Sequence, residues 1–144
     1  MATEKRAEVT WKGSLLEGSG TIHDTSSGKI GDQQISWAAR AEDAHRQTNP
    51  EELIAAAHAA CFSMALSHGL AQDGHAPEQL DTSATVSFVP GEGITKIALT
   101  VRGRVPGMDA EAFLEAAEAA KENCPVSKAL AGVPEVTLDA QLEG

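Results

Sequence analysis

Residues 48–72 read TNPEELIAAAHAACFSMALSHGLAQ, and this segment carries no charged side chain from residue 53 to residue 71. Asn49 is a favourable helix cap, Pro50 suits the first helical position, and Glu52 has the spacing of a capping box. Asp73-Gly74 follows the segment as a helix-ending signal. The pattern predicts one helix from residue 50 to about residue 72.

The predicted helix is uncharged over a length that approaches a membrane span, for which about 20 residues are needed. Alanine, serine, glycine and two histidines, His58 and His68, take the place of the Leu, Ile and Val that favour insertion. We therefore expect a helix buried nearly all round in protein, and no membrane partner. One chain of 144 residues has few large apolar side chains to cover it, so we expect an obligate homodimer.

Strand and turn signals surround this helix. Strand-like segments at residues 7–13, 20–24 and 33–41 precede it, punctuated by glycines. After it come strands at 81–89 and 94–105 joined by a Pro-Gly-Glu-Gly turn, a helix capped by Asp109, a short helix from Cys124-Pro125 to Gly132, and a strand at 135–142. The order βββ-α-ββ-αα-β predicts an α+β fold with antiparallel sheets around a long central helix.

Composition narrows the classes of function. Residues 1–144 are expected to form a single domain. The net charge of −10 and the isoelectric point near 4.8 argue against a nucleic-acid partner, whose phosphates select Lys and Arg. The polar N-terminal segment lacks the apolar core of a signal peptide, so we expect a cytoplasmic protein. Four-ligand zinc spacing is absent, and we expect no metal and no cofactor.

The chain has two cysteines, Cys61 inside the uncharged helix and Cys124 at the start of the short helix. A buried cysteine is often an inert small hydrophobe, and that interpretation stays open for Cys61. Cys124 at a helix N-terminus has the better local case for a low pKa, although a simple capping role is as plausible. The residues alone leave open which thiol attacks.

A thiolate at Cys61 needs a cation nearby, because a position in the middle of a helix receives no help from the helix dipole. Arg40 is the candidate, with Arg46 as its competitor. Glu51 lies ten residues before Cys61, or about 15 Å along a helix, so it acts only by holding an arginine. His58, one turn before Cys61, ranks third and is more often a hydrogen-bonded packing residue.

The segment from Thr48 to Leu66 closely resembles the central-helix signature of the osmotically inducible protein C family, and so does Asn-Cys-Pro-Val-Ser at 123–127. Trp-Lys-Gly at 11–13 and the segment at 94–99 extend the resemblance over nearly the whole chain. The sister branch, the organic hydroperoxide resistance proteins, takes its arginine from an earlier segment. Residues 13–32 contain no Arg here, which favours the first branch and Arg40.

The resemblance implies an intertwined homodimer and a thiol-dependent reduction of hydroperoxides in stress defence. It implies that Cys61 is the peroxidatic thiol, that Cys124 closes a disulfide with it, and that Glu51 orients Arg40. A dithiol or a lipoylated protein is the implied reductant. The wall around Phe62 and Met64 suggests organic hydroperoxides, with hydrogen peroxide a poorer substrate. The alternatives are a binding module for a small hydrophobic ligand and a structural stress protein, both with inert thiols.

Overall fold

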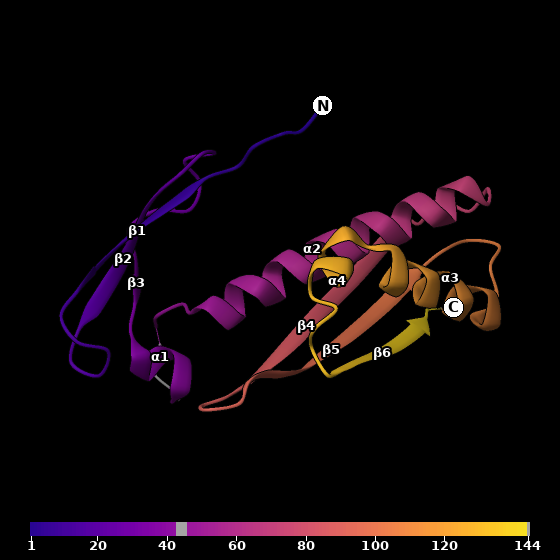
Figure 1. Cartoon of the computed structure of the whole chain (residues 1–144). Helices are drawn as coiled ribbons and strands as arrows, with labels where there is room; N and C mark the ends of the chain where they lie inside the picture. Colours follow the sequence, from indigo (N-terminus) through magenta and orange to yellow (C-terminus); the bar gives the residue numbers. More distant parts are fainter. Residues whose placement is uncertain (43–45, 144) are drawn as a thin grey trace. The chain divides into compact units, whose positions relative to one another are not determined.

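The computed structural model describes residues 1–42 and 46–143. It divides into two compact units, Met1–Glu51 and Glu52–Gly144. The chain contains both helices and antiparallel strands, so the predicted α+β class is confirmed. The element order is βββ-αα-ββ-αα-β, with one helix more than the sequence predicted (Figure 1).

The first unit contains an antiparallel sheet of β1 (Ala7–Lys12), β2 (Ser19–Thr25) and β3 (Gln33–Ile35), in that order. Gly20 of β2 pairs with Trp11 on one side and Ile35 on the other. A Cβ atom at Gly20 would lie 2.7 Å from the Trp11 ring and 3.0 Å from the Ile35 side chain. Glycine at this position therefore lets these two large apolar side chains approach each other over the sheet.

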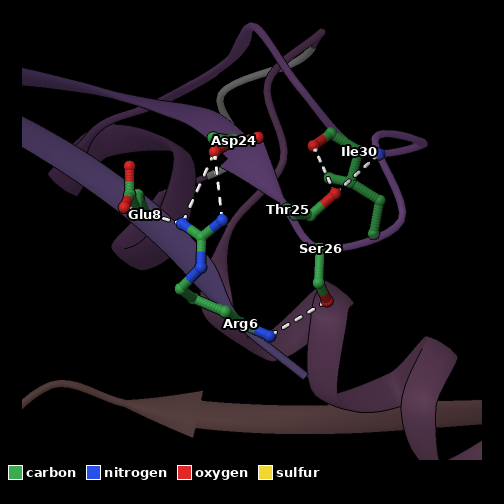
Figure 2. A network of polar contacts seen from close by, with 6 residues as sticks. All are labelled: Arg6, Glu8, Asp24, Thr25, Ser26 and Ile30. Atoms are coloured by element: carbon green, nitrogen blue, oxygen red, sulfur yellow. Dashed lines mark hydrogen bonds and ion pairs between the residues drawn. The ribbon is translucent and has the colours of Figure 1, made fainter. Parts of the chain in front are cut away.

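Polar contacts tie the start of this sheet to the loop that follows β2 (Figure 2). The Arg6 guanidinium contacts the carboxylates of Glu8 and Asp24, and the Arg6 backbone N–H donates to the Ser26 hydroxyl. These side chains are about half exposed, so the ion pairs add little to stability. Their effect is to fix where the strands begin and end.

The prediction of a strand over residues 33–41 is wrong in its second half. β3 ends at Ile35, and Trp37–Ala41 form a short helix, α1. Ser36 is extended and its hydroxyl accepts a hydrogen bond from the Ala39 N–H, which caps the helix. Four of the five residues, three alanines and one arginine, have high helix propensity, and with the Ser36 cap they favour a helix over a strand. Arg40 therefore lies on a helix and not on a strand.

The predicted long helix is present as α2 (Pro50–Gln72). Its buried positions in the second unit recur every fourth residue, at His58, Phe62, Leu66 and Leu70. The expectation of burial on nearly all sides includes a partner subunit and stays a prediction. In the single chain, alanines on the other faces of α2 are exposed, and Met64 is 72% exposed. α2 is long and apolar enough to span a bilayer by length and composition alone. The core helix of a globular protein passes the same test.

The second unit has a sheet in the order β4 (Gln79–Val89), β5 (Gly93–Arg104), β6 (Glu135–Leu142). The helices α3 (Ala110–Asn123) and α4 (Pro125–Ala129) connect β5 to β6. β4 and β5 pair antiparallel as predicted, whereas β5 and β6 pair parallel, which corrects the expectation of wholly antiparallel sheets. A crossover through two helices allows a parallel pair, which a tight hairpin cannot.

One hydrophobic core holds this unit together. Alternate residues of β5, Ile97, Leu99 and Val101, point to the same face of the sheet and are fully or almost fully buried. They pack with the α2 stripe and with Phe113 and Ala117 of α3. The shared core fixes α2 and α3 on one face of the sheet. This packing sets the relative positions of the middle of α2 and the end of α3.

Candidate active site

The two cysteines, 63 residues apart in sequence, meet in the second unit. Their Sγ atoms lie 2.8 Å apart and both thiols are free. This separation exceeds the roughly 2.05 Å of a disulfide bond, so the two sulfurs are in contact without being bonded to each other. Cys124 is fully buried and Cys61 is partly exposed. One thiol is therefore open to small molecules, and its neighbour is shielded from them.

The local sequence explains how Cys124 reaches this position. Asp109 caps α3 as predicted, its carboxylate accepting from the Ala112 N–H at 2.8 Å. At the other end, Cys124 closes α3 through its N–H to Ala120 O at 2.9 Å and begins α4 with Pro125 as the first residue. A residue before proline favours an extended backbone, and Cys124 has ψ of 125°. The turn between the helices directs the thiol toward α2.

The two thiols have pKa values shifted in opposite directions. Burial raises the pKa of Cys61, the neighbouring Cys124 raises it further, and the Val126 N–H only partly offsets this. Burial also raises the pKa of Cys124, but hydrogen bonding from Cys61, from the Ser127 N–H and hydroxyl, and from the Val126 N–H outweighs burial and lowers it. Within this pair the negative charge is favoured on Cys124, because its sulfur is the one surrounded by donors.

His58 lies one turn before Cys61 and is fully buried. Its Nε2 is 2.7 Å from the hydroxyl of Ser127, which is three residues after Cys124 at the start of α4. Burial lowers the pKa of His58, which keeps the imidazole neutral at neutral pH. His58 is thus buried and hydrogen-bonded, while its role stays a prediction. The contact with Ser127 was not predicted from the sequence.

Arg40 and Glu51 form a second preorganised pair, in the first unit. Arg40 Nε lies 3.0 and 3.2 Å from the two carboxylate oxygens of Glu51, and Nη2 lies 3.0 Å from Oε2. The Glu51 side chain is 7% exposed and that of Arg40 is 35% exposed. Asn49 adds a tie, its amide donating to Ala39 O at 3.0 Å. Such a paired geometry fixes the plane of the guanidinium.

The structure thus brings the four predicted residues together as two pairs. Cys61 meets Cys124 in the second unit, and Arg40 meets Glu51 in the first. Arg46, the competitor for the arginine role, is exposed and has a positive φ of 69°. Among residues 1–42 and 46–143, no group of three or more His, Cys, Asp or Glu side chains is placed to hold a metal ion.

An apolar hollow of about 140 Å³ lies beside Arg40 in the first unit. Its wall is formed mainly by large apolar side chains together with the guanidinium, from Trp11, Leu15, Ile35, Ser36, Trp37, Arg40 and Pro50. Of the two residues expected in the substrate wall, Phe62 is fully buried in the core, whereas Met64 is 72% exposed. Phe62 follows His58 among the buried positions of α2, and its ring packs in the hydrophobic core. The sequence analysis did not predict that Trp11 and Trp37 lie beside Arg40.

Comparisons with known proteins bear on this arrangement. Residues 42–139 match the family model described as OsmC-like protein. The chain is 45% identical over 146 aligned positions to the Escherichia coli protein named peroxiredoxin OsmC, covering 99% of each chain. It is 34% identical over 119 positions to the Bacillus subtilis organic hydroperoxide resistance protein OhrB, covering 81% of this chain and 87% of the other.

Solved structures agree with the sequence comparisons. The crystal structure of OhrB from Bacillus subtilis superposes with a TM-score of 0.62 at 30% identity, covering 96% of this chain and 98% of that one. An organic hydroperoxide resistance protein from Elizabethkingia anophelis shares the fold with a TM-score of 0.68 at 24% identity, covering 99% of this chain and 100% of that one. On the matched residues and the whole-chain similarity, this protein belongs to the OsmC-like family, as the resemblance of its helix signature indicated.

Proposed function

We propose that this protein is a thiol-dependent hydroperoxide reductase that acts in stress defence. The observation that carries the proposal is the 2.8 Å separation of two cysteine sulfurs from distant parts of the chain. The Cys61 thiolate attacks the terminal oxygen of a hydroperoxide, and the O–O bond breaks. The alkoxide leaves with the bonding electron pair, takes a proton and becomes an alcohol, while Cys61 becomes a sulfenic acid. Cys124 then displaces water from that sulfenic acid and closes a disulfide.

Exposure supports this assignment of the two thiols. Oxidation of a cysteine requires thiolate character and access together. Cys61 is partly exposed, whereas Cys124 has no exposed surface. The opposite pKa shifts of the pair favour charge on Cys124, which suits a thiol that attacks second and at close range. Cys61 therefore needs an additional cation to become a thiolate when it meets the peroxide.

Arg40 is the cation that we propose for Cys61. A guanidinium stabilises both a thiolate and the departing oxygen, because its N–H groups form a fixed fork. The Glu51 carboxylate already holds the guanidinium in one orientation. Less entropy is therefore lost when the guanidinium binds the thiolate or the departing oxygen. Glu51 comes from the segment that carries the family resemblance, and Arg40 is held against it by the hydrogen bonds described above.

The proposed substrates are organic hydroperoxides, with hydrogen peroxide reduced less well. The support is the hollow beside Arg40, where apolar side chains surround a single guanidinium. An alkyl or aryl group gains from leaving water in such a hollow, while the peroxide group keeps a charged donor. Hydrogen peroxide has no apolar part and gains nothing from that wall. The relatives named organic hydroperoxide resistance proteins are consistent with this substrate class.

The proposal includes a homodimer, a cytoplasmic location and a dithiol or lipoylated-protein reductant. The support for the dimer is the exposed apolar surface of α2, with Met64 72% exposed and alanines around it. In the proposed dimer, a second copy of the chain packs against this surface of α2 and excludes water from it. A dithiol reductant follows from the product, since an internal disulfide is reopened by two successive thiol attacks.

The proposal is tested by peroxide consumption with a dithiol reductant. We expect wild type to reduce cumene hydroperoxide over many turnovers and Cys61→Ser to have no activity above the buffer rate. Ser63→Ala is the matched control: Ser63 is two residues from Cys61, and its hydroxyl makes hydrogen bonds to Ala59 O and Thr82 Oγ1. Full turnover by Cys61→Ser would leave a ligand-binding or structural role with inert thiols as the better account.

A further inference from the structure

His58 and Ser127 form a polar contact beside the two cysteines that the proposed reaction does not use. His58 has no exposed surface, and its Nε2 lies 2.7 Å from Ser127 Oγ. The buried Nδ1 of His58 has no hydrogen-bond partner among residues 1–42 and 46–143. A buried polar atom without a partner costs free energy, and such atoms are uncommon in folded proteins. The histidine is therefore held at this position at some cost to stability.

Packing alone does not account for a histidine at position 58. The next three buried positions of α2 hold Phe62, Leu66 and Leu70. An apolar side chain at position 58 would continue this row without leaving a polar atom unpaired. What the imidazole adds is one hydrogen bond, and that bond leads from α2 to α4.

The direction of this hydrogen bond follows from the position of the imidazole proton. A neutral imidazole carries one N–H, on Nε2 or on Nδ1. A proton on Nδ1 would leave a buried donor unpaired, which is rarer in proteins than an unpaired acceptor. The proton is therefore assigned to Nε2, which donates to Ser127 Oγ.

The cysteine contact and the histidine contact join the same two segments at matching positions. His58 and Cys61 are three residues apart on α2, and Cys124 and Ser127 are three residues apart at the start of α4. Residues at this spacing lie on one face of a helix. Cys61 meets Cys124 at 2.8 Å, and His58 meets Ser127 at 2.7 Å. The two segments therefore pass each other in opposite directions, joined at two points that are roughly 4.5 Å apart along the helix axis.

Cys124 lies at the joint between a helix that is anchored in the core and one that is not. Ala117 and Ala120 of α3 are buried, and the Cys124 N–H donates to Ala120 O at 2.9 Å. None of the five residues of α4 is buried. The core thus fixes the backbone on the α3 side of the thiol, and the hydrogen bond from His58 holds the helix on the other side.

We propose that His58 and Ser127 are positioning residues for the disulfide: their hydrogen bond holds the start of α4 where the Cys124 sulfur stays beside the Cys61 sulfur. A disulfide bond is about 2.05 Å long, so the two sulfurs need to approach each other by less than about 1 Å. Sliding α4 by one residue along its axis displaces it by about 1.5 Å, which breaks the hydrogen bond and separates the sulfurs. The contact therefore raises the effective concentration of one thiol at the other.

The contact acts on the step that forms the S–S bond, and for peroxide reduction the proposal rests on the function proposed above. In that step, the Cys124 sulfur attacks the sulfur of the Cys61 sulfenic acid, and the S–O bond breaks. The oxygen leaves as water, with its own proton and the proton of the Cys124 thiol. The Cys61 sulfur is reduced and the Cys124 sulfur is oxidised. The same bond also closes when a small disulfide is the oxidant, with no peroxide present.

The first test therefore uses no peroxide. The full chain is equilibrated with mixtures of reduced and oxidised dithiothreitol, quenched with acid, alkylated and analysed by mass spectrometry. In this exchange, oxidised dithiothreitol is reduced to its dithiol while the two thiols of the protein are oxidised to the disulfide. We expect Ser127→Ala and His58→Leu each to lower the equilibrium constant for closing the protein disulfide about three- to tenfold, since one hydrogen bond is lost.

Two further variants separate loss of the contact from a general loss of stability. Ser127→Thr retains the hydroxyl, and its equilibrium constant should lie within about twofold of the wild-type value. The double variant His58→Leu/Ser127→Ala should fall no further than either single variant, since both changes remove the same contact. Losses that multiply in the double variant contradict the proposal.

Ser63→Ala is the matched control. The Ser63 hydroxyl makes hydrogen bonds to Ala59 O and to Thr82 Oγ1, and the second is also 2.7 Å long but joins α2 to β4. Its loss should leave the equilibrium constant unchanged. An unchanged constant in Ser127→Ala, or an equal fall in Ser63→Ala, overturns the proposal. Should His58→Leu fail to fold, as judged by circular dichroism, the comparison of Ser127→Ala with Ser127→Thr decides.

The second test measures how the Cys61 sulfenic acid is divided between closure and over-oxidation. Reduced protein is mixed with cumene hydroperoxide at an excess that gives both products in wild type, and the disulfide and the sulfinic acid are quantified by mass spectrometry. Their ratio does not depend on how fast the sulfenic acid forms. We expect Ser127→Ala to lower the ratio of disulfide to sulfinic acid about three- to tenfold, and Ser63→Ala to keep it.

The two tests distinguish failure of this proposal from failure of the proposed function. A wild-type ratio of disulfide to sulfinic acid in Ser127→Ala contradicts the positioning role. If wild type forms neither product at any concentration of cumene hydroperoxide, the proposed function fails. The dithiothreitol equilibrium then still decides whether His58 and Ser127 position the two cysteines.

Discussion

The guanidinium of Arg40 and the carboxylate of Glu51 face each other with N···O distances of 3.0, 3.2 and 3.0 Å. The Glu51 side chain is almost fully buried, and about a third of the Arg40 side chain is exposed. A buried acid that holds a partly exposed arginine is an arrangement for presenting the arginine to something else. In the proposed reaction, that partner is the Cys61 thiolate and the departing oxygen.

Replacing Glu51 by Gln tests this relationship. Gln offers one oxygen where Glu offers two and removes the charge, so the guanidinium loses its fixed plane. We expect kcat/KM for organic hydroperoxides to fall about ten- to a hundredfold, the cost of a misplaced catalytic group. Glu8→Gln, in the exposed Arg6–Glu8 pair, is the control and should retain wild-type activity. Wild-type kinetics in Glu51→Gln would show that the pair is only structural.

Replacing Cys124 by Ser separates the two chemical steps. Without an added reductant, the variant should rapidly consume one equivalent of peroxide per Cys61 and form no disulfide, because no second thiol is present to close it. Its sulfenic acid should be trapped by dimedone and, in excess peroxide, should proceed to sulfinic acid. Intact-mass measurements after each addition follow this sequence. Multiple turnovers by Cys124→Ser at the wild-type rate would rule out the internal disulfide as the resolving step.

The buried His58 predicts how stability depends on pH. Its pKa is lowered below the usual 6.5 by burial, so below that pH the unfolded chain binds a proton that the native chain does not. By linkage, the free energy of unfolding falls as the pH drops through 6.5, at up to about 1.4 kcal/mol per pH unit from this group. Above 6.5 both states hold a neutral imidazole, and this contribution does not change.

Urea unfolding at several pH values between about 7.5 and 5.5 measures this effect. His58→Gln should show a shallower fall in the free energy of unfolding across that interval than wild type. His68→Gln, at an exposed position on the same helix, is the control and should keep the wild-type slope. Equal slopes in wild type and His58→Gln would mean that His58 takes up a proton in the native state as readily as in the unfolded state.

Gly103 on β5 controls how closely α3 packs on the sheet. A Cβ atom there would lie 2.5 Å from Phe113 Cζ and 3.2 Å from Leu80 Cδ2. Phe113 is fully buried, so its ring has little room to move. Gly103→Ala should lower the free energy of unfolding by about 1–3 kcal/mol, the usual cost of overpacking. Gly132→Ala, where nothing lies within 4 Å, should change it by less than about 0.5 kcal/mol in the same denaturant titration.

Elements with strong local signals were predictable from the sequence. Asn49-Pro50 marked the start of α2, Asp109 marked the start of α3, and the Pro-Gly-Glu-Gly turn marked the hairpin between β4 and β5. These signals act over a few residues, so no tertiary information was needed. The helix at Trp37–Ala41 was missed because its alternating pattern resembles a strand and only the Ser36 cap decides the matter.

Features that depend on the fold of distant segments were not predictable from local patterns. β6 pairs parallel with β5 because the connection between them is a crossover. The sequence of a strand does not show whether it will pair parallel or antiparallel. The residues at the candidate site were found through the family resemblance, because the signature contains both cysteines. The contact of His58 with Ser127 joins residues 69 apart in sequence, and neither residue type demands it. The hollow beside Arg40 likewise brings together Trp11 of β1 and Trp37 of α1, which are 26 residues apart in sequence.

The central claim is that Cys61 and Cys124 become bonded to each other when a hydroperoxide is reduced. The direct measurement is to add one equivalent of cumene hydroperoxide to fully reduced protein, then count free thiols, quantify cumyl alcohol and map the cross-link by mass spectrometry. Our account predicts the loss of both thiols for each alcohol formed, an intramolecular Cys61–Cys124 link, and full recovery with a dithiol. Retention of both thiols while peroxide disappears, or a link only between different chains, would contradict it.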